Sequence, residues 1–466
     1  MYSNQPDSGL TLIYVSAFSL TYFLGAVIYA FPWYHTGKFL DTTIRGFIEV
    51  TIALIAFGVG NILVAPLILK LIHPRQNVQN NKLIYSQYYL PKFYFFIGLI
   101  FFIVLFPLLG RLPTISAIIS VGQYFIVVGI CLRCYQAFVI EKNYSAFRNW
   151  IILSFLFPFI TIINQGFLGY GTIMALIVLI FVGRFYRPRW RVFLAGIIVF
   201  YFALTFYQGY IRDREEIRET VWGGQSLVIR MEQLYSTIST TKLFNPYNNE
   251  QLERIDLRLN QNYLLGYAVE NLELSKDYAN GETLKDSLIA LVPRIVWPQK
   301  PVVAGSGDLV ENYTGLKFEK STSIGIGQVM EFYINFGRLG VIIGFIIIGL
   351  IISILDFISG IYLNRGDWRS FTFYFIPGIA LLNIGGSFVE ITAAAASGIV
   401  VTILASLIPK NYYSRFLLII FLLASLFVIK KFYLPLVVPI FNYILVFIFL
   451  IFCLFLLKSF IQVNKK

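Results

Sequence analysis

Charged residues are scarce in this chain of 466 residues: Asp, Glu, Lys and Arg make up 13% of the sequence, while 58% is hydrophobic. Soluble domains carry about 25% charged residues, because their surfaces must face water. The scarcity therefore excludes a soluble enzyme and an intrinsically disordered chain. The composition indicates a polytopic membrane protein.

Histidine and cysteine are also rare, with two and three copies in the chain. None of them lies in residues 209–323, so we expect neither a disulfide framework nor a zinc site in that stretch. Cys131 and Cys134 form a C-x-x-C motif inside an apolar run, where membrane packing is the expected role. The chain has no Asp-x-Asp motif, which disfavours a metal-dependent nucleotide-sugar site. We expect no metal and no cofactor.

Long apolar runs dominate what remains. A membrane-spanning helix needs about 20 mostly apolar residues. The sequence contains about twelve candidates, at 10–31, 45–70, 93–110, 115–139, 150–165, 167–183, 192–208, 338–361, 371–388, 392–409, 416–430 and 434–457. Because a backbone in lipid must satisfy its own hydrogen bonds, these runs predict an all-α integral membrane protein.

Lys and Arg are unevenly divided between the two sets of short connections. One set holds eighteen of them and the other holds five. Connections rich in Lys and Arg stay in the cytoplasm, so this distribution predicts that both termini are cytoplasmic. It also divides the chain into residues 1–208 with spans one to seven, a mostly helical extracytoplasmic loop or cap at 209–337, and residues 338–466 with spans eight to twelve.

The net charge of +13 is not gathered on one soluble face. Basic residues sit at the ends of hydrophobic runs, where they set topology, so the lipid bilayer rather than nucleic acid is the expected partner. Residues 209–323 differ from the rest, since they carry 16 of the 24 acidic residues and 13 of the 37 basic ones. This is the one stretch long enough to form a small domain.

Several arginines of this stretch lie on predicted amphipathic helices. Arg230 lies beside the apolar face of a helix at 225–239, and Arg212 lies close to the membrane. Arg254 and Arg258 are four residues apart on a second helix, so they share a face. Such a pair suits either a solvated surface with acidic partners or a phosphate group.

Two further segments have distinctive motifs. Residues 283–301 place Arg294, Trp297 and Lys300 among three prolines that restrict the backbone. Residues 321–340 have Gly325 and Gly327 before a helix that carries Glu331, Asn335 and Arg338 into the eighth span. Ionisable groups at membrane depth usually face a cavity, although Glu331 could instead pair with a nearby arginine for structure.

The run Leu-Val-Pro-Arg-Ile-Val-Trp-Pro-Gln-Lys-Pro, followed by Gly-Ile-Gly-Gln-Val-Met-Glu-Phe-Tyr-Ile-Asn-Phe-Gly-Arg-Leu-Gly, resembles the O-antigen polymerases. These Wzy-type integral membrane glycosyltransferases join oligosaccharide repeat units. The specific part of the resemblance covers residues 283–340, and span count and loop placement extend it loosely over the chain. Many members carry a Gly-Gly-Thr-Arg-like turn between two short spans, whereas residues 164–171 here contain no arginine.

The resemblance implies a location in the bacterial inner membrane and a metal-independent reaction on its extracytoplasmic side. A growing glycan on polyprenyl pyrophosphate is transferred to a single lipid-linked repeat unit. Lipid-linked oligosaccharides are then the expected partners, and a chain-length regulator protein is a further candidate. The expected catalytic residues are Arg294, Glu331 and Arg230. The expected ligands of the substrate and its pyrophosphate are Lys300, Arg254, Arg258, Arg212, Trp297 and Asn335.

Other readings of the sequence remain open. A flippase or exporter of lipid-linked oligosaccharides would share the spans and a basic cavity, but flippases mostly have short loops. A peptidoglycan-type glycosyltransferase or an O-antigen ligase would be an enzyme with different acceptors. Ligases resemble this architecture but generally carry a histidine in the large external loop. A non-enzymatic scaffold is a further alternative. Glu390, beside Gly385 and Gly386, is an additional candidate for lining a cavity, and Asp41 and Glu49 flank the first external connection.

Overall fold

The computed structural model describes residues 6–34, 39–72, 84, 86–106, 113–186, 190–292, 297, 299–301, 305–318 and 324–407. Every regular element in these ranges is a helix, so the predicted all-helical fold is confirmed. The α-helices in the first half of the described ranges are α1 (Leu10–Val27), α2 (Leu40–Gly58), α3 (Ala65–Ile72), α5 (Leu90–Ile100), α7 (Pro113–Gly122), α8 (Tyr124–Tyr135), α9 (Tyr144–Ser154), α10 (Phe157–Gln165), α11 (Leu168–Tyr186), α12 (Trp190–Arg212) and α13 (Arg214–Trp222).

The remaining α-helices in the described ranges are α14 (Leu227–Thr240), α15 (Asn249–Leu259), α16 (Asn262–Ser275), α17 (Glu282–Ala290), α18 (Ser306–Thr314), α19 (Gln328–Arg365), α20 (Trp368–Ala380) and α21 (Phe388–Ser406). Short polar side chains begin several of them, because they accept a hydrogen bond from a free N–H of the first turn. Asn143 begins α9 in this way, Ser226 begins α14 and Ser387 begins α21.

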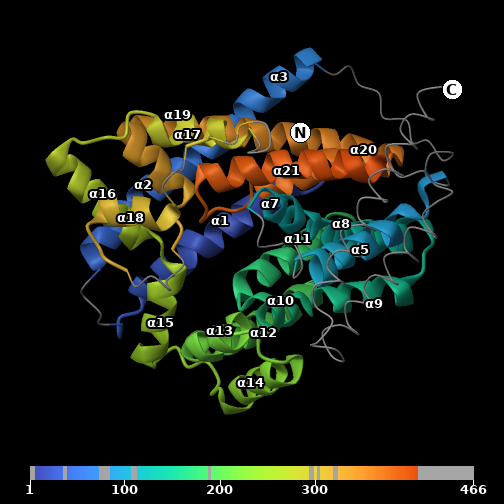
Figure 1. The fold of residues 1–466 in the computed structure, drawn as a ribbon, viewed down its shortest axis with the longest axis horizontal. Coiled ribbons are helices and arrows are strands. Elements are labelled where there is room, and N and C mark those ends of the chain that lie inside the picture. Colours follow the sequence, from blue (N-terminus) through green and yellow to red (C-terminus); the bar gives the residue numbers. More distant parts are fainter. Residues whose placement is uncertain are drawn as a thin grey trace.

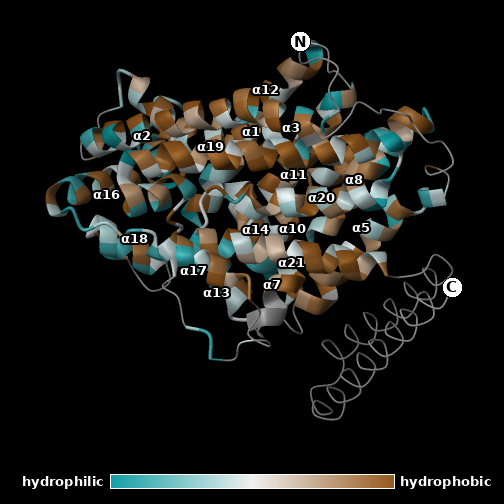
Figure 2. Ribbon diagram, turned by 90° about the horizontal axis from the view of Figure 1, so that it is seen from above, coloured by the Kyte–Doolittle hydropathy of each residue, from teal (hydrophilic) through white to brown (hydrophobic). Residues whose placement is uncertain are grey.

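Eight helices of the described residues are long and apolar enough to cross a membrane, which indicates a membrane protein. They cover Leu10–Ala30, Leu40–Leu71, Ala117–Ile140, Tyr144–Gln165, Leu168–Tyr186, Trp190–Arg212, Gln328–Arg365 and Phe388–Ser406. Each corresponds to one predicted span. Figure 2 shows that these helices are hydrophobic over most of their length and that hydrophilic residues gather around α16 and α18.

The other four predicted spans have different outcomes. Within the described residues the run at 93–110 gives an apolar helix over Leu90–Ile103, and residues 107–110 lie outside them. The run at 371–388 forms α20, which ends at Ala380 before an irregular loop at 381–387. The spans at 416–430 and 434–457 lie outside the described residues. Twelve spans therefore remain a prediction.

The segment 209–337, called the cap segment below, contributes α13 to α18. Figure 1 shows α13 to α16 and α18 together along one side of the molecule. The segment is not merely laid on the bundle, since α16 packs against α2 along facing glycines. A Cβ atom built on Gly266 would lie 1.7 Å from the Thr42 carbonyl oxygen, and one on Gly46 would lie 2.0 Å from the Asn262 carbonyl oxygen. The two backbones are thus in direct contact.

Asp356 of α19 fixes the start of α1 from across the bundle. Its Oδ1 accepts hydrogen bonds from the N–H groups of Ser8 at 2.7 Å, Gly9 at 2.8 Å and Leu10 at 3.1 Å. Its Oδ2 accepts a further bond from the Thr11 N–H at 3.1 Å. A carboxylate at a helix N-terminus is stabilised by these free donors and by the helix dipole. The contact ties α1 to α19, the helix that also carries Glu331.

Candidate functional site

The glycine pair before α19 allows two loops to touch. The Gly327 N–H donates to the Gly385 carbonyl at 3.0 Å, and the Gln328 N–H donates to the Ile384 carbonyl at 3.0 Å. A Cβ atom on Gly325 would lie 1.9 Å from the Gly385 carbonyl oxygen. Only glycine fits at that position, so this part of the motif holds the first turn of α19 against the loop between α20 and α21.

Four polar side chains follow along the start of α19, three at helical spacing and the fourth just after a break in the helix at Phe336 and Gly337. We call them the polar stripe: Gln328, Glu331, Asn335 and Arg338. Gln328 accepts a hydrogen bond of 2.6 Å from the Tyr14 hydroxyl of α1. Arg338 donates from Nε to Glu49 Oε1 of α2 at 2.9 Å, and Glu49 is 1% exposed. Each end of the polar stripe therefore joins α19 to a different helix.

Asn335 uses its whole amide group inside the protein. Its Nδ2 donates to Thr283 Oγ1 at 2.7 Å and to the Glu331 carbonyl at 2.7 Å, while its Oδ1 accepts from the Gly281 N–H at 2.9 Å. The residue is fully buried. These contacts fix the start of α17, the helix that leads into the proline-rich motif. The geometry gives Asn335 a positioning role, and direct substrate contact remains a prediction.

Glu331 is the member of the polar stripe that keeps a free acceptor. Its side chain is fully buried, and Oε2 accepts a hydrogen bond of 2.6 Å from the Phe388 N–H at the start of α21. Its Oε1 is buried and has no partner at hydrogen-bonding geometry among the described residues, and the Thr283 hydroxyl lies close to the carboxylate. A buried carboxylate oxygen without a partner is costly, so this position suits either a proton or the hydroxyl group of a bound molecule.

Further carboxylates lie close to Glu331. Glu390 and Asp286 are near enough to interact with it electrostatically, and Ser306 Oγ donates to Glu390 Oε1 at 3.0 Å. The structure therefore gathers acidic groups from α17, α19 and α21. No group of His, Cys, Asp and Glu in the described ranges is arranged to hold a metal ion.

The proline-rich motif is described only in part. Arg294, predicted as a catalytic residue, lies outside the described residues. Trp297 is 41% exposed. The Lys300 ammonium donates to the carbonyls of Ala290 and Val292, each at 3.1 Å, at the end of α17. A cation at a helix C-terminus satisfies free carbonyls and the helix dipole. Lys300 thus anchors the motif to α17.

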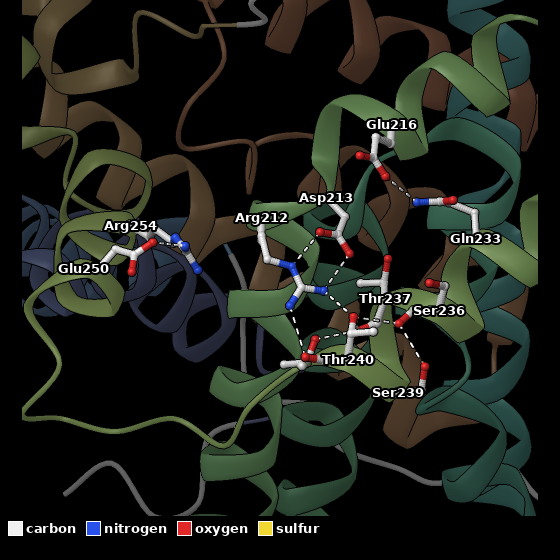
Figure 3. A network of polar contacts seen from close by, with 11 residues as sticks. Arg212, Asp213, Glu216, Gln233, Ser236, Thr237, Ser239, Thr240, Glu250 and Arg254 are labelled. Carbon is white, nitrogen blue, oxygen red and sulfur yellow. Dashed lines mark hydrogen bonds and ion pairs between the residues drawn. The ribbon is translucent and has the colours of Figure 1, made fainter.

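Two of the predicted phosphate ligands have acidic partners, and their contact with a phosphate remains a prediction. Arg212 forms a two-pronged contact with Asp213, at 2.6 Å from Nε and 2.8 Å from Nη2, and also bonds Thr240 (Figure 3). Arg254 pairs with Glu250, four residues earlier on α15. This pairing is the solvated-surface arrangement that was the alternative to a phosphate site. Arg254 and Arg258 share a helix but have different surroundings, and a phosphate-binding role remains a prediction for both.

Arg230 belongs to α14, and its side chain contacts the end of α10. Its Nε donates to the Gln225 carbonyl at 2.9 Å and its Nη1 donates to the Ile163 carbonyl at 3.2 Å. The guanidinium group thus holds the start of α14 against the turn between α10 and α11. A direct part in catalysis remains a prediction for this residue.

Three other arginines form what we call the arginine cluster: Arg214 and Arg218 of α13, and Arg258 of α15. They are close enough to repel one another, and no carboxylate of the described residues forms an ion pair with any of the three. Burial, followed by the charges of Arg258 and Arg218, lowers the pKa of Arg214 to about 10. Like charges brought together without a counter-charge favour binding of an anion.

Arg218 is the most buried member of the arginine cluster, at 7% exposed. Its guanidinium carbon lies 4.6 Å from the ring centroid of Phe167 and 5.2 Å from that of Trp222. Its Nε is buried and has no hydrogen-bond partner. Phe167 belongs to the turn at 164–171, which contains no arginine of its own. Arg218 therefore brings a cation to that turn from α13.

Tyr170 connects the cationic and acidic groups. It lies at the start of α11, just after the Phe167 turn, and is near enough to interact electrostatically with both Glu390 and Arg218. Arg218, Tyr170, Glu390 and Glu331 therefore form one continuous neighbourhood. Of the predicted residues, the structure brings Glu331 and Arg258 toward this neighbourhood, while Arg212, Arg254 and Lys300 have local partners.

Sequence reasoning missed Arg214 and Arg218. They occur in a mixed run with Glu215, Glu216 and Glu219, so the local charge is balanced and suggests a solvated helix. Their spacing of four residues was the available signal, because it places both on one face of α13. Glu215, Glu216 and Glu219 are exposed, whereas Arg218 is buried.

Comparison with known proteins gives a family but no function. The model of a family described as a domain of unknown function, DUF8712, matches residues 14–359, which is well over half of the chain. No curated protein and no solved structure matches the chain. This chain belongs to the DUF8712 family.

Proposed function

We propose that this protein polymerises polyprenyl-pyrophosphate-linked oligosaccharide repeat units on the extracytoplasmic face of the bacterial inner membrane. In this proposal the chain has about twelve spans and cytoplasmic termini, and the cap segment lies outside the cytoplasm. The growing glycan moves from its lipid carrier to the end of a second lipid-linked repeat unit. The resemblance carried by residues 283–340 supports this reading.

The observation that carries the proposal is the arginine cluster. It follows α12, a helix long and apolar enough to cross a membrane, by two to six residues in the case of Arg214 and Arg218. Guanidinium groups bind phosphate oxygens through paired hydrogen bonds. Three of them near the end of a spanning helix, none in an ion pair with a described carboxylate, suit the pyrophosphate of a lipid-linked glycan.

The acidic side of the neighbourhood supplies the second requirement. In the proposed reaction the acceptor hydroxyl oxygen bonds to the anomeric carbon of the donor sugar, while the bond from that carbon to pyrophosphate breaks. The hydroxyl proton passes to Glu331, and the leaving pyrophosphate takes the bonding electron pair. The arginine cluster stabilises the charge that develops on it, as other pre-placed cations do in phosphoryl leaving-group chemistry.

The experiment replaces the chromosomal gene with an Arg218→Gln variant and separates the surface polysaccharide on a gel. We expect the long-chain ladder to disappear while single repeat units remain attached, with the protein present at its normal level. Arg45→Gln is the matched control, because Arg45 is exposed and pairs with Glu273 instead. That control is expected to keep the ladder.

Three outcomes would overturn the proposal. Accumulation of lipid-linked repeats on the cytoplasmic side would show a flippase, which shares the need for a cationic site. Normal lipid-linked polymer that fails to reach its final acceptor would show an O-antigen ligase. An unchanged ladder in Arg218→Gln would remove the arginine cluster from the reaction.

A further inference from the structure

The described part of the protein covers little of helix α12 over most of its length, and Tyr201, whose hydroxyl donates to the Phe244 carbonyl at 3.0 Å, is in contact with the cap segment. Residues 190–203 are all exposed, which is nearly four helical turns. Only 17% of its apolar window is buried, against 28–72% for the other seven helices that could cross a membrane. An ordinary lipid-facing helix packs one face against its neighbours. Here the face turned toward the bundle is also uncovered.

The end of α12 nearest the cap segment is packed, in contrast. Tyr207 belongs to two apolar clusters, one shared with the end of α1 and one shared with α10. The rings of Phe206 and Phe159 lie 5.0 Å apart. The face of α12 that carries Tyr207 is therefore the face toward the bundle.

We call the face that carries Tyr207 the inner face of α12. From Tyr207 toward the N-terminus of the helix, it continues through Ala203, Phe200, Gly196 and Phe193, at spacings of three and four residues. All four are exposed, and Phe193 and Phe200 are 72% and 44% exposed. A Cβ atom on Gly196 would meet nothing within 4 Å. The space beside this face is therefore open from Ala203 downward for about 15 Å, at 1.5 Å per residue.

The opposite end of the same space is cationic. Tyr207 is near enough to Arg214 and Arg258 to interact with both electrostatically, and Tyr210, one turn further along α12, interacts with Arg218. The inner face of α12 thus passes from apolar residues, through two tyrosines, to the arginine cluster. An amphiphile with a long apolar chain and a strongly anionic head has this distribution of polarity.

We propose that one polyisoprenoid chain lies along the inner face of α12, with its phosphate or pyrophosphate head at the arginine cluster. This inference rests on the proposed function and assigns it a lipid entry site. The apolar chain covers Phe193 to Ala203, which are exposed in the described part of the protein. The head meets three guanidinium groups, which suit a pyrophosphate better than the single phosphate charge of an ordinary phospholipid.

The test uses the full chain in phosphatidylcholine nanodiscs supplied with undecaprenyl pyrophosphate. A photoreactive p-benzoylphenylalanine replaces Phe200 on the inner face or, as control, Ile198. These positions are two residues apart, about 200° around the helix and at nearly the same depth. We expect undecaprenyl adducts at position 200, at least tenfold above position 198. Adding Arg218→Gln is expected to reduce the adduct at position 200 at least tenfold.

Several outcomes would overturn the inference. Equal labelling at positions 198 and 200, or phospholipid adducts at position 200 that undecaprenyl pyrophosphate does not displace, would show ordinary membrane lipid. A crosslink to a second copy, or to another segment of the same chain, would show that protein covers the face.

A second pair of variants separates the lipid site from the reaction. Ala203→Trp fills the space below Tyr207, whereas Ile198→Trp adds the same ring on the far side. We expect Ala203→Trp to lower undecaprenyl labelling at position 200 at least tenfold and Ile198→Trp to leave it unchanged. Two results together would retain the lipid site and reject the polymerase. They are labelling that follows this pattern and a polymer ladder that persists in cells without the protein. If the ladder depends on Arg218 but position 200 is not labelled, the polymerase is retained and the lipid site is rejected.

Discussion

Glu331 accepts a hydrogen bond of 2.6 Å from the Phe388 backbone N–H, so a buried carboxylate of α19 binds the first turn of α21. The bond uses Oε2 and leaves Oε1 without a partner at hydrogen-bonding geometry among the described residues. One oxygen therefore holds two helices in place while the other remains available. This division lets a single side chain serve both the fold and the proposed chemistry.

Glu331→Gln tests the available oxygen. The amide retains the side-chain volume and an acceptor for Phe388, but it cannot take a proton from a hydroxyl group. We expect polymer synthesis to fall by about 10²–10⁴-fold, the usual contribution of a general base. The measurement is the rate of polymer formation from lipid-linked repeat units by purified protein.

Glu390→Gln is the comparison for this prediction, because Glu390 lies nearby and retains its acceptor for Ser306. We expect it to lower the rate by less than tenfold. Equal losses in the two variants would point to a general electrostatic effect. Full activity of a normally folded Glu331→Gln protein would exclude the base.

Gly337→Ala tests the break inside α19. Gly337 has φ 60° and ψ −151°, a backbone conformation that glycine alone adopts readily. The substitution is expected to lower the free energy of unfolding by about 1–3 kcal/mol. Thermal unfolding in detergent measures it, with Gly183→Ala as control.

The control separates backbone strain from a general effect of alanine. A Cβ atom on Gly183 meets nothing within 4 Å, and the residue lies inside α11. We expect that variant to be neutral or stabilised by up to about 1 kcal/mol. A Gly337→Ala protein as stable as the natural one would show that the break is not needed.

Gly266→Ala tests the attachment of the cap segment. The added Cβ would lie 1.7 Å from the Thr42 carbonyl oxygen, so α16 must move away from α2. Forcing atoms into a packed contact costs about 1–3 kcal/mol. We expect faster limited proteolysis within residues 209–337 and a lower unfolding temperature. Gly169→Ala, at a helical position with open space, should leave both unchanged.

Asp213→Asn tests the contact in Figure 3 through its pH dependence. The hydrogen bond from Arg212 lowers the pKa of Asp213 below its ordinary value. A carboxyl group whose folded pKa is depressed stabilises the fold above its unfolded pKa of about 3.9 and loses that contribution as pH falls through the folded value.

We expect Asp213→Asn to cost about 1 kcal/mol at pH 7, with the difference starting to shrink near pH 4 and disappearing as pH falls through the lowered pKa of folded Asp213. The measurement is unfolding temperature against pH. Glu253→Gln is the control, because Glu253 is exposed on α15 and no ion pair with a described residue involves it. A difference that stays constant down to acid pH would show that charge at Asp213 is irrelevant.

Most of the helical framework could be predicted from apolar runs alone, because in lipid the backbone has few other solutions. Helix ends were harder. The apolar run at 371–388 suggests a full span, yet α20 ends at Ala380 because residues 381–386 carry backbone contacts with the start of α19. Those contacts join segments more than 50 residues apart, and no local pattern encodes them.

The candidate site was only partly accessible from the sequence. Glu331 stood out because a carboxylate within an apolar helix is unusual. The spacing of Arg254 and Arg258 predicts that they share a face and could bind one phosphate together, but Arg254 forms an ion pair with Glu250 on its own helix. Arg218 acquires its burial from Phe167 and Trp222, and its association with the Phe167 turn comes from tertiary folding alone.

The polar stripe affects how screening data on this family should be interpreted. Its four members join α19 to α1, α2, α17 and α21, so a loss-of-activity scan would score all of them alike. Three of those losses would come from misassembly and be accompanied by reduced abundance. A substitution at Glu331 that abolishes product while abundance stays constant would be distinguishable in the same scan, provided that each variant's quantity is recorded beside its output.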